Sequence, residues 1–181
     1  PERGFDVRHD LAHNPARMNP ATVQEIESAI RNVPDFQPTG LPYTAHHPEL
    51  ADGRLFGSTI GHLLEGVNAG DVDKIVGIDA RGFIFGAAAA VRIGAGFVPI
   101  RKKGKLPWNT HEQDYDLEYG SNTVAIHTDA VHAGERVMLI DDLLATGGTA
   151  SAALKLMERL GAKVVGVRFV IELKFLNGRD R

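Results

Sequence analysis

The chain has 181 residues, 43% of them hydrophobic, a length that suits one compact domain. Its formal net charge of -3 includes no block of five or six like charges, which argues against a nucleic-acid-binding tail and a polybasic membrane anchor. The absence of cysteine excludes disulfide frameworks and thiolate metal sites. The longest apolar run, residues 82–91, is far shorter than the roughly 20 residues that cross a bilayer. We therefore expect a cytoplasmic protein with small-molecule partners and no nucleic-acid or membrane partner.

The N-terminal third predicts two helices separated by a loop. Asn19 and Pro20 are typical of an N-cap and a first helical position. The apolar residues that follow at helical spacing are Val23, Ile26, Ile30 and Val33. We expect residues 1–18 to form a flexible tail and residues 34–47, rich in proline, to form an irregular loop. A second helix is predicted at about residues 53–67.

From residue 74 onward, short β-branched runs alternate with apolar segments of helical length. We predict strands at residues 74–78, 96–100, 123–127, 136–140 and 163–173, and helices at residues 83–93 and 151–160. The polar segments between them, residues 102–116 and 141–150, are predicted as loops. This alternation is typical of an α/β fold with a mostly parallel twisted sheet covered by helices on both faces.

The segment after residues 136–140 carries the strongest functional signal, because ligands of open α/β sheets bind at the carboxyl ends of strands. Asp141 and Asp142 are acceptors that suit a sugar diol or a magnesium-bound sugar. The loop that follows offers backbone N–H groups and hydroxyls before a helix N-terminus, a combination that favours phosphate: Ala145, Thr146, Gly147, Gly148 and Thr149. The segment therefore predicts a ribose 5-phosphate site, with an ordinary strand end and helix cap as the alternative. No strand-to-helix turn carries a dinucleotide-binding or Walker pattern.

The string VMLIDDLLATGGTA resembles the phosphoribosyl pyrophosphate signature of type I phosphoribosyltransferases, in the form typical of the members that use adenine. The resemblance covers roughly residues 33–179 of the chain. It implies that Asp141 and Asp142 contact the ribose hydroxyls and that residues 145–149 wrap the 5-phosphate. Relatives that use hypoxanthine usually carry an acidic residue where this chain has Ala145.

Two further segments resemble the part of the same family that binds pyrophosphate. IDARGFIFGAA resembles its pyrophosphate loop, and RKKGKLP resembles its basic segment after the next strand. Arg81 also stands between a strand and a helix, where a guanidinium can grip phosphate oxygens, although a surface arginine that caps a turn is the alternative. A solvated basic loop is the alternative for RKKGKLP. The residues that the resemblance assigns to pyrophosphate are Asp79, Ala80, Arg81, Arg101, Lys102 and Lys105, and we expect Arg81 and Lys105 to be catalytic.

The polar segment at residues 106–115 resembles the flexible catalytic loop of the family and is predicted to be a lid. The resemblance implies that Glu118 exchanges a proton with the purine and that Tyr119 lies near it. It also assigns the base to residues 35–50, within an N-terminal helix and hood segment at residues 19–52, and implies that Pro42, Tyr43 and Thr44 contact the base. Thr44 and Ala45 stand where the family usually has Arg and Asp.

The resemblance implies a glycosyltransferase of purine salvage and AMP biosynthesis. It would move the 5-phosphoribosyl group from phosphoribosyl pyrophosphate to adenine with inversion, through an oxocarbenium-like transition state, and release pyrophosphate. Mg²⁺ is expected to arrive with phosphoribosyl pyrophosphate, without a dedicated protein metal site. A single domain at residues 19–181, with the hood segment at its start, is expected to form a homodimer.

Three alternatives remain open. One is a phosphoribosyltransferase that uses xanthine or another oxopurine, and another is a non-catalytic regulator that binds phosphoribosyl pyrophosphate on the same fold. The third concerns His46 and His47, whose pairing suggests a metal site only weakly, since no third ligand stands at a suitable spacing.

Overall fold

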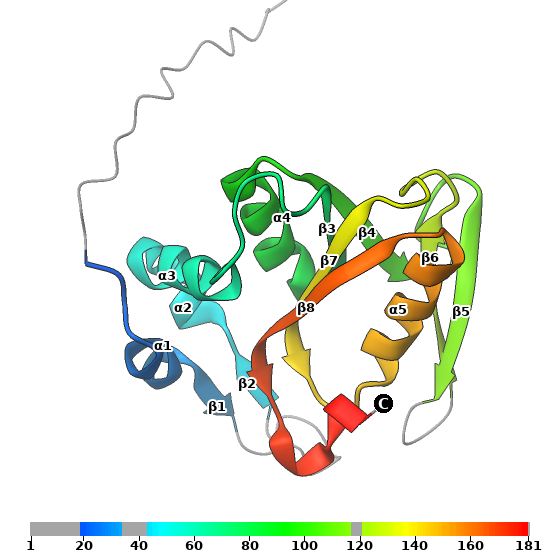
Figure 1. Cartoon of the computed structure of the whole chain (residues 1–181). Coiled ribbons are helices and arrows are strands. Elements are labelled where there is room, and N and C mark those ends of the chain that lie inside the picture. Colours follow the sequence, from blue (N-terminus) through cyan, green and yellow to red (C-terminus); the bar gives the residue numbers. More distant parts are fainter. Residues whose placement is uncertain (1–18, 34–42, 117–120, 181) are drawn as a thin grey trace, which may run out of the picture. The chain divides into compact units, whose positions relative to one another are not determined.

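The computed structural model describes residues 19–33, 43–116 and 121–180 (Figure 1). The chain divides into two compact units, residues 1–58 and 59–181, and each is described here by itself. The predicted tail, residues 1–18, lies outside the described residues, and a single domain at residues 19–181 stays a prediction. Within the described part of the chain, no helix combines the length and apolar character needed to cross a membrane.

The first unit contains short helices and a small antiparallel sheet. Its elements are α1 Val23–Ala29, β1 Arg31–Val33, β2 Tyr43–Ala45 and α2 His47–Ala51, and α3 Gly53–Leu63 begins in it. β1 pairs with β2, with Val33 opposite Tyr43. The prediction of a loop at residues 34–47 was wrong for residues 43–47, which form β2 and begin α2, while residues 34–42 lie outside the described part.

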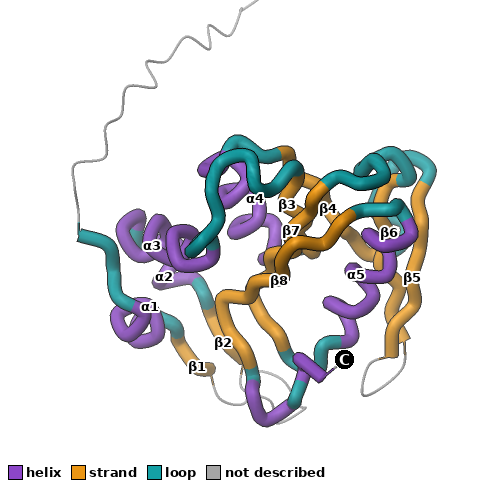
Figure 2. The backbone as a smooth tube through the Cα atoms, in the orientation of Figure 1, coloured by secondary structure: helices purple, strands orange, loops and turns teal. Residues whose placement is uncertain are grey.

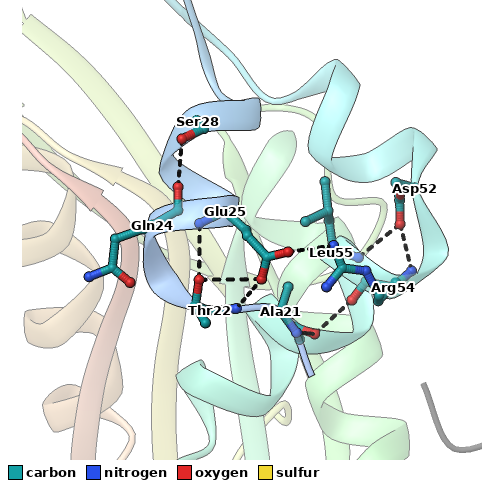
Figure 3. A network of polar contacts seen from close by, with 9 residues as sticks. Ala21, Thr22, Gln24, Glu25, Ser28, Asp52, Arg54 and Leu55 are labelled. Carbon is teal, nitrogen blue, oxygen red and sulfur yellow. Dashed lines mark hydrogen bonds and ion pairs between the residues drawn. The ribbon is translucent and has the colours of Figure 1, made fainter. Parts of the chain in front are cut away.

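The N-cap of α1 is Thr22, so the prediction of Asn19 was wrong. The hydroxyl of Thr22 accepts the backbone N–H of Glu25 at 3.3 Å, and the carboxylate of Glu25 accepts the N–H of Thr22 at 2.8 Å. Figure 3 shows this reciprocal capping box. The helix also ends earlier than predicted: Ile30 is already extended, and the chain continues into β1.

The second unit is built on a six-stranded sheet with the order β5-β6-β4-β3-β7-β8 (Figure 2). The strands are β3 Lys74–Ile78, β4 Gly96–Lys102, β5 Thr110–Asp116, β6 Ser121–His127, β7 Arg136–Leu144 and β8 Lys163–Glu172. Pairing is parallel from β4 through β3 and β7 to β8, and antiparallel for β5 and β6. The predicted α/β fold with a mostly parallel sheet is therefore confirmed.

Two long helices cover opposite faces of this sheet, α4 Arg81–Ile93 and α5 Gly148–Arg159. Val76 on β3 belongs to the buried cluster that includes the apolar face of α5. Its neighbour Gly77 lies close to Gly86 of α4, since a Cβ on Gly86 would stand 3.5 Å from the Cα of Gly77. Successive strand residues point to opposite faces, so the two helices sandwich β3 between them.

Two predicted strand ends differ from the structure because strand pairing extends further than the apolar pattern. β4 continues through Arg101 and Lys102, which pair with β6. β7 continues through Asp141 and Asp142 to Leu144, which pairs with Glu172 of β8. These residues were predicted to follow their strands, and instead they form the ends of them.

The prediction of a loop at residues 102–116 was wrong for residues 110–116, whereas the role of residues 106–115 as a lid stays a prediction. The polar sequence THEQDYD forms β5, which pairs with β6 along its whole length, from Thr110 opposite His127 to Asp116 opposite Ser121. Its backbone therefore satisfies its hydrogen bonds in an edge hairpin, a role that an apolar pattern does not reveal. The chain closes with two 3-10 turns, Lys174–Leu176 and Gly178–Asp180.

Candidate active site

The loop between β7 and α5 forms a small concave site at the carboxyl end of the sheet. A cavity of about 80 Å³ there is lined by the five residues assigned to the 5-phosphate, Ala145, Thr146, Gly147, Gly148 and Thr149, together with Asp141. Gly147 is the N-cap of α5 and has φ 81°, a conformation that favours glycine. The first N–H groups of α5 have no acceptor within the helix and carry the positive end of its dipole, so the loop suits a phosphate dianion.

Two adjacent buried carboxylates stand beside this loop. Asp141 and Asp142 are 9% and 6% exposed, and the backbone N–H of Asp142 donates to Oδ1 of Asp141 at 2.9 Å. Burial, and then the neighbouring charge of Asp142, raise the pKa of Asp141 to about 8. This raised pKa favours the protonated form of Asp141, so the pair can offer a ribose diol a donor as well as acceptors.

Gly82 makes room for Asp141 at the start of α4. A Cβ on Gly82 would lie 2.3 Å from Oδ1 of Asp141, which is far inside van der Waals contact. The sequence analysis missed this role, although a glycine directly after Arg81 at a strand-to-helix turn was a visible signal. The start of α4 can therefore approach the end of β7 this closely because residue 82 lacks a side chain.

The segment between β3 and α4 places a guanidinium against the acidic pair. The peptide bond between Asp79 and Ala80 is cis, and Arg81 is the first residue of α4. The Nε–H of Arg81 donates to Oδ2 of Asp142, although the two residues are 61 positions apart. The predicted pyrophosphate segment and the predicted ribose segment are thus joined by an ion pair.

A second ion pair continues the same arrangement onto β4. The Nε–H of Arg101 donates to Oδ2 of Asp79 at 2.9 Å, and its Nη1–H donates to the carbonyl of Lys105 at 3.0 Å. Lys102 and Lys105 are exposed beside it. Asp79 was predicted to face pyrophosphate, and in the structure it is a partner of Arg101. The carboxylate of Asp79 therefore orients Arg101, and the assignment of Asp79 to pyrophosphate stays a prediction.

Lys103, which was not assigned a role, has a partner of its own. Its ammonium lies 2.6 Å from the carboxylate of Glu112 on β5. This pair joins the basic turn to the edge hairpin. The contact supports the omission of Lys103 from the predicted pyrophosphate residues.

The remaining predicted residues lie elsewhere or outside the described part of the chain. Glu118, Tyr119 and Pro42 are outside it. Tyr43 and Thr44 are described only as backbone, in β2 of the first unit. Their assignment to the base stays a prediction.

A metal role for His46 is not favoured by its surroundings. Nδ1 of His46 lies 3.0 Å from Oε2 of Glu49, and both side chains are buried. No group of three or more His, Asp or Glu residues that could hold a metal ion occurs among the described residues. The His46–Glu49 contact therefore reads as a structural pair within the first unit.

Comparisons with known proteins agree with this geometry. The sequence model of the family described as Phosphoribosyl transferase domain matches residues 46–174. An adenine phosphoribosyltransferase of Acidothermus cellulolyticus is 49% identical over 165 residues, which cover 91% of this chain and 93% of that protein.

Solved structures of adenine phosphoribosyltransferases share the fold. The structure from Rhodothermus marinus has a TM-score of 0.84 and 46% identity, covering 88% of this chain and 90% of that one. The structure from Saccharomyces cerevisiae, complexed with D-2,5-dideoxy-2,5-imino-altritol 1,6-bisphosphate and adenine, has a TM-score of 0.83 and 40% identity, covering 87% and 92%. The family model and these relatives show that the chain belongs to the phosphoribosyl transferase family, and the glycine-rich loop and the acidic pair agree with this.

Proposed function

We propose that this protein is an adenine phosphoribosyltransferase, which converts adenine and phosphoribosyl pyrophosphate into AMP and pyrophosphate. The observation that carries this proposal is the phosphate-sized cavity lined by residues 145–149 and Asp141, directly beside the Arg81–Asp142 pair. The choice of adenine is supported by relatives and solved structures of that activity at 40–49% identity. Ala145, at the position where hypoxanthine-using relatives usually carry an acidic residue, agrees with that choice.

The proposed substrate spans neighbouring elements at one edge of the sheet. In this proposal the loop before α5 binds the 5-phosphate, and Asp141 and Asp142 bind the ribose hydroxyls. Arg81, at the start of α4, and Arg101, near the end of β4, would then contact pyrophosphate. Since Arg81 is paired with Asp142, the arriving pyrophosphate shares or takes over a guanidinium that is already oriented.

The chemical step breaks the bond between the anomeric carbon and the pyrophosphate oxygen. The leaving oxygen keeps the electron pair, and the ribose passes through an oxocarbenium-like state. N9 of adenine forms the new bond from the opposite face, and its proton passes to a base, which we propose is Glu118. Arg81, Arg101, Lys102 and Lys105 stabilise the charge that develops on pyrophosphate, so they act mainly in the transition state.

Mg²⁺ is proposed to arrive with phosphoribosyl pyrophosphate and to neutralise part of its charge. The residues present fit this arrangement, because Asp141 and Asp142 already accept a backbone N–H and the guanidinium of Arg81. They are therefore suited to ribose hydroxyls more than to a metal cage, and the phosphates supply the hard oxygen ligands that Mg²⁺ prefers.

We further propose a homodimer in the cytoplasm. The resemblance to the family supports the homodimer. The absence of cysteine supports the cytoplasmic location, because such a composition suits a reducing compartment. Light scattering of the purified protein and fractionation of cells that express it test the two statements separately.

The proposed activity is tested by mixing the protein with phosphoribosyl pyrophosphate, Mg²⁺ and one base at a time. The bases are adenine, hypoxanthine, guanine and xanthine, and chromatography follows both nucleotide and pyrophosphate. We expect AMP from adenine alone, with one pyrophosphate for each AMP. Turnover of an oxopurine instead would overturn the choice of base, and binding of phosphoribosyl pyrophosphate without turnover of any base would favour a regulator.

A further inference from the structure

The C-terminal turn lies against the back of the phosphate loop. Gly178 is buried, and a Cβ on it would stand 2.2 Å from the carbonyl oxygen of Ala145 and 3.1 Å from the backbone N of Gly147. The contact is reciprocal, because a Cβ on Gly147 would stand 2.2 Å from the carbonyl oxygen of Gly178. Two glycines 31 positions apart in the sequence therefore let two backbone segments touch directly.

The turn is anchored on both sides of this contact. Leu144 and Glu172 are partners in the pairing of β7 with β8, and the N–H of Leu173 donates to the carbonyl of Leu144 at 2.9 Å. Leu173, the first residue of the turn, therefore lies beside Leu144, the residue directly before the phosphate loop. On its far side, Nε–H of Arg179 donates to Oε1 of Glu172 at 2.7 Å. This ion pair lowers the pKa of Glu172.

The conformation of the turn suits this close approach. Asn177 has φ 49°, in the left-handed region, and its N–H donates to the carbonyl of Lys174 at 3.2 Å. Asparagine tolerates that region better than most residues with a side chain. The reversal at Asn177 brings Gly178 back toward the end of β7, where the loop begins.

A groove of about 380 Å³ borders Gly147 and Gly178, and its walls come from α5 and β8, among them Ser151, Leu154 and Phe169. On this side of the loop, the described backbone contact is the one with Gly178. Displacement of the turn would let the N–H groups of the loop move.

We propose that the turn at residues 173–180 is a positioning element for the 5-phosphate site, with Gly178 as its contact residue and the Arg179–Glu172 pair as its latch. The turn fixes the direction of the N–H groups at Gly147 and Gly148 without touching the substrate. Its loss should therefore weaken the grip on the phosphorylated ribose and leave the affinity for adenine nearly unchanged. This inference rests on the proposed function for its kinetic test.

Gly178→Ala tests the contact. We expect the KM for phosphoribosyl pyrophosphate to rise about ten-fold, since misplaced donors weaken charge-assisted hydrogen bonds to phosphate, while the KM for adenine stays within about two-fold. Gly57→Ala in α3 is the matched control, because its Cβ would meet no atom of the described residues within 4 Å. That variant should keep both KM values. Unchanged kinetics in Gly178→Ala, or an equal rise in both KM values, would overturn the proposal.

Arg179→Ala tests the latch in a variant that should fold normally, since the side chain of Arg179 is 73% exposed. We expect a rise of about two- to five-fold in the KM for phosphoribosyl pyrophosphate, in line with the small energies of exposed ion pairs, and recovery in Arg179→Lys. An Arg179→Ala protein with wild-type kinetics would remove the latch from the proposal.

Calorimetric titration with ribose 5-phosphate separates this inference from the proposed activity. If no base is turned over but Gly178→Ala still binds ribose 5-phosphate about ten-fold more weakly than the wild type, the positioning role holds and the proposed function fails. If AMP forms normally and the affinity for ribose 5-phosphate is the same in both proteins, the positioning role fails alone.

Discussion

The two strand-to-helix turns of the site, which we propose bind phosphate oxygens, offer different kinds of donor. The β7–α5 loop uses backbone N–H groups, a glycine with φ 81° and a helix N-terminus. The β3–α4 segment uses the guanidinium of Arg81, which is paired with Asp142. The first turn presents its donors in place, whereas the second holds a charge that has to be shared with the ligand. This difference suits a group that stays on the product in one case and a leaving group in the other.

The largest effect is expected from removing the charge on the pyrophosphate side. Arg81→Ala should lower kcat/KM by about 10²–10³-fold, because it deletes a donor aimed at the charge that develops on the leaving group. Steady-state kinetics with phosphoribosyl pyrophosphate as the varied substrate measure this loss. Arg81→Lys keeps the positive charge but lacks the planar guanidinium, so its kcat/KM should lie between those of the wild type and Arg81→Ala. Activity above half the wild-type value in Arg81→Ala would show that the guanidinium does not act on pyrophosphate.

Gly82→Ala tests how closely the start of α4 approaches Asp141 at the end of β7. Its Cβ would stand 2.3 Å from Oδ1 of Asp141, so we expect a loss of about 1–3 kcal/mol in the free energy of unfolding, together with weaker ribose binding. Urea unfolding followed by circular dichroism measures the stability. Gly61→Ala in α3 is the control, since its Cβ would make only an ordinary contact with Arg92 at 3.7 Å. Equal stability of Gly82→Ala and the wild type would contradict the close approach of the turns.

Asp141 makes stability depend on pH in a direction opposite to that of most acidic residues. Its pKa of about 8 in the folded chain lies above the ordinary value near 4, so the folded state binds the proton more tightly than the unfolded state. The contribution is full below pH 4 and is lost as pH rises toward 8. Asp141→Asn should therefore be more stable than the wild type by about 1–3 kcal/mol at pH 8, with the difference shrinking toward pH 4. Thermal unfolding of both proteins across this range measures it, and parallel curves would contradict it.

The smallest effect is expected in the capping box of the first unit. Thr22→Ala should cost about 1 kcal/mol of unfolding free energy through the loss of the N-cap, and it should leave the KM for phosphoribosyl pyrophosphate unchanged. Denaturant titration and steady-state kinetics check the two statements. A changed KM would mean that α1 influences phosphate binding.

The same region gives a second pH dependence, of opposite sign. A hydrogen bond from Arg54, and then the backbone N–H of Thr22, lower the pKa of Glu25 from 4.5 to about 2 (Figure 3). The stabilisation by Glu25 is therefore present above pH 4.5 and is lost as pH falls toward 2. Glu25→Gln should flatten the acid limb of the stability curve, and an unchanged limb would show that the pair with Arg54 adds nothing.

The sequence predicted well what local patterns determine. The apolar runs KIVGI and RVMLI became the central strands β3 and β7, and the glycine-rich loop lies at the N-terminus of α5 as expected. Prediction failed where pairing overrides local pattern: the polar sequence of β5 looked like a loop, and the N-cap depended on whether Asn19 or Thr22 found a partner three residues later.

Contacts between distant residues were beyond prediction from one sequence. Arg81 meets Asp142 and Gly178 meets Ala145 only because β3, β7 and β8 are neighbours in the sheet. The sequence identified Arg81, Asp142 and Ala145 as candidate site residues and gave Gly178 no role, but it did not reveal which of these residues contact one another. For the same reason, the bond between Asp79 and Arg101 could not be predicted from the sequence.

The division of labour between the two turns is tested most directly by measuring the affinities of ribose 5-phosphate and pyrophosphate separately, by calorimetry, for the wild type, Gly147→Ala and Arg81→Ala. We expect Gly147→Ala to weaken ribose 5-phosphate by about ten-fold or more and to spare pyrophosphate, and Arg81→Ala to do the reverse. If both variants lost both ligands to the same degree, the two turns would act as one site and the account would be wrong.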